Sequence, residues 1–74
     1  MTQFYTQCLL DRNGSRQHAW IPKQFAQPGR FIGIKENGEW QEGWQVISCF
    51  DSMEEKAVKR QSNYYKNTRE GSDI

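Results

Sequence analysis

The chain has 74 residues and a net charge of +1 at neutral pH, and 14% of its residues are aromatic. A chain of this length folds as one domain around a small core, which leaves little room for a deep substrate cleft. No apolar run approaches the roughly 20 residues that a membrane-spanning helix needs, and no secretory signal is recognisable at the first residues. We therefore expect a cytoplasmic protein without a membrane segment, in which Cys8 and Cys49 stay reduced in the core.

The first half of the chain is predicted to form short antiparallel strands. Residues 4–10 and 16–21 are rich in aromatic and apolar residues and flank Asn13-Gly14, a dipeptide that supplies the positive φ angles of a tight hairpin. Pro22 ends the second strand because it has no amide hydrogen to donate. Residues 30–35 form the third strand, where Gly33 indicates a bend or the close approach of a neighbouring backbone.

The position of Trp40 depends on the turn that follows the third strand. Asn37-Gly38 predicts a tight turn, which would place Trp40 in a fourth strand. Gly43 offers a competing turn, which would leave Trp40 at the tip of a longer loop. The sequence is compatible with both. Residues 44–50 then carry apolar side chains on both faces, which is typical of a central strand.

The pattern changes at Ser52. Ser52 and Glu55 match a capping box, with Asp51 as the alternative cap, and a helical periodicity follows. We therefore predict a helix over residues 52–66 that completes a single domain of residues 1–66, with residues 67–74 as a frayed tail. The predicted apolar arc of this helix consists of Met53, Ala57, Val58, Tyr64 and Tyr65.

Strands followed by one terminal helix predict a mainly β fold. We expect a small SH3-like β barrel, because the strands are few and short. The alternatives are an open antiparallel sheet with the helix packed across it and an OB-like barrel.

The last third of the chain is also strongly basic. Between residues 56 and 69 there are five cations and no acid, whereas residues 1–55 sum to −2. Such cations could hold the phosphates of a nucleic acid while a tyrosine stacks on a base, although they are equally typical of a solvated helix face. The residues of this candidate nucleic-acid site are Lys56, Lys59, Arg60, Tyr64, Lys66 and Arg69.

Aromatic residues give a second candidate site, for a protein partner. Trp40, with Phe25 and Trp20, would form an apolar contact patch, and tryptophan is enriched among the residues that dominate protein interfaces. Trp20 is equally suited to the core. Protein recognition through a loop or a strand edge needs no strong net charge, so this hypothesis is preferred. A homo-oligomer formed through a strand edge is a further possibility.

No motif predicts catalysis, a cofactor or a metal. His18 is the only histidine, and one histidine with two cysteines is too small a set for the four ligands of a structural zinc site. The glycines are explained by turns or bends and match no nucleotide-binding motif. We therefore expect a non-enzymatic binding protein.

Several short motifs resemble a set of very small bacteriophage-encoded proteins. They are Trp20-Ile21-Pro22-x-x-Phe25-Ala26-x-x-Gly29, Gly43-Trp44-x-Val46, Tyr65-Lys66-x-x-Arg69 and the terminal Ser72-Asp73-Ile74. The resemblance spans residues 16–74, but residues 38–43 are longer here, so Trp40 lies outside it. It implies a phage accessory protein that acts in the bacterial cytoplasm. Small phage proteins commonly occupy the surface of a host or phage macromolecule, so by analogy we expect this one to bind and modulate a host or phage protein during host takeover. The resemblance assigns no role to any single residue.

Overall fold

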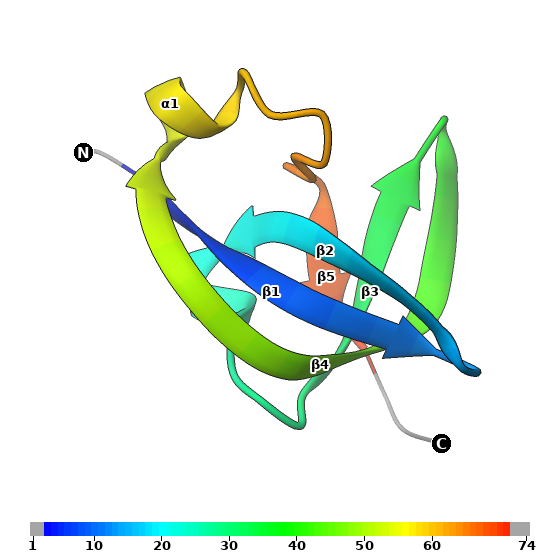
Figure 1. Cartoon of the computed structure of the whole chain (residues 1–74). Helices are drawn as coiled ribbons and strands as arrows, with labels where there is room; N and C mark the ends of the chain where they lie inside the picture. Colours follow the sequence, from blue (N-terminus) through cyan, green and yellow to red (C-terminus); the bar gives the residue numbers. More distant parts are fainter. Residues whose placement is uncertain (1–2, 72–74) are drawn as a thin grey trace.

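The computed structural model describes residues 3–71, which form one five-stranded antiparallel sheet with a short helix. In chain order the elements are β1 (Phe4–Arg12), β2 (Ser15–Pro22), the 3-10 turn η1 (Lys23–Phe25), β3 (Phe31–Glu36), β4 (Glu39–Glu54), α1 (Glu55–Val58) and β5 (Thr68–Glu70). The strand order in the sheet is β2-β1-β4-β3-β5 (Figure 1). The mainly β fold is confirmed, and an open antiparallel sheet, one of our alternatives, describes it. A closed SH3-like barrel is not shown.

Two Asn-Gly turns join the first four strands as tight hairpins. Asn13 (φ 52°) and Asn37 (φ 53°) both adopt a left-handed backbone, and each is followed by a glycine with positive φ. Two consecutive positive φ angles are the requirement of a type I′ turn. The predicted hairpin at Asn13-Gly14 is confirmed. Of the two turns that the sequence allowed after the third strand, the structure has the tight one at Asn37-Gly38, which places Trp40 within β4 rather than in a loop.

The long strand β4 is bent, which lets it pair with two different strands. Its first half pairs with β3 and its second half with β1. The register shifts once against β3 and twice against β1, and each shift adds one residue on β4. Extra residues of this kind bend a strand and increase its twist. Figure 1 shows the result, a curved ribbon that runs from the β3 hairpin to α1. The prediction that residues 44–50 form a central strand is confirmed, although β5 follows it, so it is not the final strand.

The buried side chains form two clusters. The main core is enclosed by the first four strands and consists of Cys8, Leu10, Ala19, Ile21, Ile32, Ile34, Trp44 and Val46. A smaller cluster contains Tyr5, Trp20 and Val58, with Tyr64 packed against it. Val58 is the only buried residue of α1, so this cluster is where the helix attaches to the sheet.

The predicted helix over residues 52–66 is wrong. Residues 52–54 continue β4, and the Ser52 hydroxyl lies 2.9 Å from the Thr6 hydroxyl instead of capping a helix. The helix begins after Glu54, which makes no side-chain cap, and it ends at Val58. No helix within residues 3–71 is long and apolar enough to cross a membrane.

Pairing with β2 explains why the helix stops. The Trp20 amide donates to the Asn63 carbonyl at 2.8 Å, and the Tyr65 amide donates to the Trp20 carbonyl at 3.0 Å. Residues 63–65 are therefore extended, and extended backbone directs adjacent side chains to opposite sides. Tyr64 thus reaches the smaller cluster while Tyr65 reaches the main core, which a helical turn would not allow.

The C-terminal segment is also more ordered than a frayed tail. Thr68–Glu70 pairs with β3 as β5, so the predicted tail of residues 67–74 is wrong for this part. The motif Ser72-Asp73-Ile74 lies outside the described residues.

Candidate protein-binding surface

Trp40 is exposed at the edge of the β3–β4 hairpin. It is the second residue of β4 and lies opposite Lys35 of β3. Its exposed fraction is 38%, which makes it one of four large exposed hydrophobic side chains among the described residues. The tight Asn37-Gly38 turn fixes this position, because a longer loop would have changed the register of the hairpin.

The guanidinium of Arg69 lies over the Trp40 ring. Its Cζ atom is 4.2 Å from the ring centroid. The Arg69 Nε donates to Glu42 Oε2 at 2.7 Å, and its Nη2 donates to the same oxygen. An exposed cation–π contact and a surface ion pair are each worth at most about 1 kcal/mol. Their main effect is therefore to hold the Arg69 side chain in one place.

Gly33 leaves the space that the Glu42 carboxylate occupies. The pairing of β3 with β5 puts Gly33 opposite Arg69. A Cβ atom at Gly33 would lie 2.7 Å from Glu42 Oε1, so any larger residue would push the carboxylate away. We call the group formed by Gly33, Lys35, Trp40, Glu42 and Arg69 the Trp40–Arg69 surface. It is built by β3, β4 and β5 together.

The other two aromatic candidates do not join this surface. Trp20 is only 4% exposed and belongs to the smaller buried cluster, so it does not offer a contact to a partner. Phe25 is half-buried and packs against the main core, with the Arg30 guanidinium 5.7 Å from its ring centroid. Of the three residues proposed from the sequence, Trp40 alone is exposed.

The candidate nucleic-acid residues are divided among three parts of the fold. Lys56, Lys59 and Arg60 lie in or just after α1, and Lys59 pairs with Glu55 at 3.4 Å. Lys66 is exposed in the segment between α1 and β5, and Arg69 is in β5, where Glu42 engages it. The absence of a long helix means that these cations do not form the single helical face that the sequence predicts.

The side chains of Tyr64 and Tyr65 pack against the buried clusters. The Tyr64 ring meets the Tyr5 ring edge-on at 5.0 Å, and its hydroxyl donates to the Tyr5 hydroxyl at 3.4 Å. The Tyr65 hydroxyl donates to Glu36 Oε2 at 2.6 Å. Burial, and then the adjacent Glu36 carboxylate, raise the pKa of Tyr65 to about 12. Both tyrosines attach residues 63–65 to the sheet, and the Tyr64 ring is partly buried against Tyr5.

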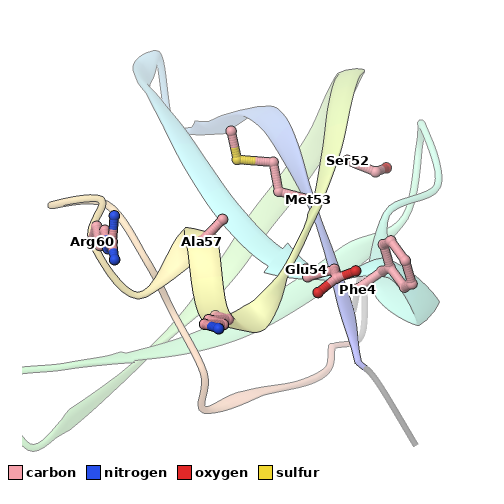
Figure 2. Close-up of a pocket in the computed structure, with 7 residues that line it drawn as sticks. Phe4, Ser52, Met53, Glu54, Ala57 and Arg60 are labelled. Atoms are coloured by element: carbon pink, nitrogen blue, oxygen red, sulfur yellow. The ribbon is translucent and has the colours of Figure 1, made fainter.

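A shallow hollow lies where β4 meets α1. Figure 2 shows Met53, Ala57 and Arg60 on one side of the end of β4, and Phe4 and Glu54 on the other. Alternation along the strand accounts for this division. The hollow has a volume of about 450 Å³, but it is open to solvent rather than enclosed, and side chains from both faces of the strand line it.

His18 and the two thiols lie on opposite faces of the sheet. Cys8 is paired with Ala19 in the core, so the neighbouring His18 points outward, where its ring is 5.8 Å from the Phe50 ring. A Cys–His catalytic pair is thus not assembled. Within residues 3–71 no three potential metal-ligating side chains come together.

No protein-family model, curated protein or solved structure matches the chain significantly. The site therefore has to be judged from its geometry. Sequence reasoning missed Glu42, which it assigned to a competing turn, and it interpreted Gly33 only as a bend or a close backbone approach, while it placed Arg69 in a different site. The signal for their association lies in the pairing of β5 with β3, which no local pattern reveals.

Proposed function

We propose that this chain is a non-enzymatic protein-binding module whose contact residues are Trp40 and Arg69. The observation that supports it is the exposed Trp40 ring with Arg69 already held against it by Glu42. Tryptophan and arginine are the residues most enriched at interface positions that dominate affinity. Fixing a flexible arginine before binding reduces the entropy that association would otherwise cost.

The charge distribution favours a protein over a nucleic acid as the partner. Arg69 and Lys59 both have carboxylate partners, and the whole chain carries only one net positive charge. A nucleic-acid site depends on several cations that are free to replace counterions on the phosphates. A mixed surface of tryptophan, arginine, lysine and glutamate is typical of a protein interface instead.

The biological setting is a further part of the proposal. The resemblance to small bacteriophage-encoded proteins supports an accessory role in the bacterial cytoplasm, in which the module binds a host or phage protein and modulates it. A chain of this size has little room for a deep cleft of its own, which favours a role in which it occupies a surface of a larger molecule.

We also propose that the sheet closes into an SH3-like barrel. Residues 63–65 contact β2 at one edge of the sheet, and the same segment continues into β5 at the other edge. If this connection closes the sheet, the amides of Trp20 and Tyr65 will exchange with solvent as slowly as those of the central strands. Fast exchange at these two amides would leave the sheet open.

The binding proposal is tested with four purified proteins on nuclease-treated bacterial lysate. Wild type is compared with Trp40→Ala, Arg69→Lys and Phe50→Ala. Phe50 is the matched control, because it is an aromatic residue of the same strand with an exposed fraction of 51%. Any protein that wild type captures is then purified, and its affinity for all four proteins is measured.

We expect Trp40→Ala to weaken binding by at least about 30-fold, the loss that corresponds to about 2 kcal/mol at an interface hot spot. Phe50→Ala should bind as wild type does. Arg69→Lys keeps the charge but loses the planar guanidinium that stacks on the ring, so it should also weaken binding. Equal affinity of wild type and Trp40→Ala would refute the proposal.

The same proteins distinguish the nucleic-acid alternative. If DNA or RNA is retained at about 50 mM salt and released steeply as salt rises, the ligand is a polyanion. In that case Arg69→Lys would bind like wild type, since a phosphate contact needs only the charge.

A further inference from the structure

Cys8 and Cys49 face each other across the pairing of β1 with β4. The two residues are direct partners in the strand register, and the Cys8 Sγ lies 3.5 Å from the Cys49 Sγ. Both cysteines are free thiols. Directly opposite residues of antiparallel strands have Cα atoms about 4.5 to 5.5 Å apart, which lies within the range of about 4.4 to 6.8 Å that disulfides require. The backbone thus already holds these residues in bridging position.

We propose that Cys8 and Cys49 form an oxidisable dithiol, in which Cys49 reacts with a small disulfide oxidant and Cys8 then closes a cross-strand disulfide. The site is independent of the Trp40–Arg69 surface, since Cys8 belongs to the main core and Cys49 packs against it.

The two thiols differ in accessibility, which sets the order of reaction. Cys8 is fully buried, whereas Cys49 is partly exposed, so only Cys49 is within reach of an oxidant in the folded protein. Burial, and then the hydrogen bond to Cys49, raise the pKa of the Cys8 thiol. A thiol that resists ionisation is a poor first nucleophile. Cys8 is suited instead to attack a sulfur that is already beside it.

With oxidised glutathione as the oxidant the reaction balances in two exchanges. The Cys49 thiolate attacks one sulfur of the glutathione disulfide, forms a mixed disulfide and releases one glutathione thiolate. Cys8 loses its proton and attacks the Cys49 sulfur, which breaks the mixed disulfide and releases the second glutathione. Two electrons pass from the dithiol to the oxidant, and the two thiol protons end on the two glutathione molecules.

The bond would join strands that are distant in the sequence. Cys8 and Cys49 are 41 positions apart, so the cross-link restricts a large loop of the unfolded chain. A disulfide that closes a loop of this size in a small domain is expected to raise the melting temperature by at least about 10 °C. The register of β1 on β4 is thereby locked at its centre.

The test treats the reduced, folded, full-length chain with a series of glutathione redox buffers. After each treatment the protein is alkylated in denaturant, and its mass and monomer content are measured. Wild type should lose both titratable thiols, gain no glutathione, remain monomeric and melt at a higher temperature than the reduced form. A stable glutathione adduct, a disulfide-linked dimer, or persistence of both thiols in the most oxidising buffer would overturn the proposal.

Two variants check the assigned roles. Cys8→Ala should accumulate the glutathione adduct on Cys49, because the resolving thiol is missing. Cys49→Ser should leave Cys8 unmodified as long as the protein is folded. If Cys49→Ser instead reacts at the wild-type rate, Cys8 is the accessible thiol and the proposed order is wrong. An oxidised wild type that melts no higher than the reduced form would show that the native register does not accommodate the bond.

Discussion

The substitution Val58→Ala tests whether this side chain attaches the C-terminal third of the chain to the sheet. The helix α1 has four residues, which is far too short to be stable on its own. Val58 is its single buried residue, with an exposed fraction of 0%, and it packs with Tyr5 and Trp20. If this contact holds the helix in place, Val58→Ala will destabilise the whole domain.

The expected loss follows from the buried volume. Val58→Ala removes two carbon atoms, worth about 0.8 kcal/mol each on transfer from water, and leaves a small cavity that adds to the cost. The free energy of unfolding should therefore fall by about 2 kcal/mol. For a domain of this size, about 1 kcal/mol corresponds to 4–8 °C, so the melting temperature should fall by about 10 °C.

The neighbouring Ala57 provides the matched control. In a helix over residues 52–66, Ala57 and Val58 would both face the sheet, and Ala57→Gln would be as costly as Val58→Ala. In the structure Ala57 is exposed, so Ala57→Gln should change stability by less than about 0.5 kcal/mol. Urea unfolding followed by tryptophan fluorescence measures both variants. Equal losses for the two variants, or a loss below about 0.5 kcal/mol for Val58→Ala, would refute the reasoning.

Two further predictions concern the Trp40–Arg69 surface and the packing of Tyr65. Gly33→Ala should displace the carboxylate that holds Arg69, so the upfield ring-current shift of the Arg69 side-chain protons over Trp40 should disappear from the NMR spectrum; an unchanged shift would mean that the carboxylate does not hold the guanidinium. Tyr65→Phe should cost about 1.5 kcal/mol at neutral pH, because it removes a hydrogen bond to the Glu36 carboxylate. The raised pKa of Tyr65 means that the folded state keeps its proton while the unfolded state ionises, so this contribution is complete below pH 10 and is lost as pH rises toward about 12. Unfolding measured across this window should show the two proteins converge, whereas a constant difference would contradict the assignment.

The first half of the fold could be predicted because its determinants are local. Asn13-Gly14 and Asn37-Gly38 adopt the positive φ angles that tight hairpins require, and few other residue pairs do so without strain. The apolar residues on both faces of residues 44–50 likewise indicated a central strand, and β4 is one. In these segments the structure that the Asn-Gly turns and the alternation of apolar side chains predict is the one that forms.

The C-terminal third was decided by tertiary contacts. Its helical periodicity was real, but two hydrogen bonds to Trp20 and the separate packing of Tyr64 and Tyr65 favour an extended chain over a helix. The intrinsic helix propensity of a segment contributes little to stability. It is overridden when another conformation buries more side chains and satisfies the backbone hydrogen bonds.

The sequence by itself determined the mainly β class of fold and the first hairpin, and it singled out Trp40 as a candidate contact residue without deciding its turn or its exposure. Only the tertiary structure decided what surrounds that candidate, because Gly33, Glu42 and Arg69 come from three strands and meet only after β5 has paired with β3. It also brought Cys8 and Cys49 into contact across β1 and β4. Strand register is set by the sum of many distant contacts, so the positions that it joins cannot be read from spacing along the chain.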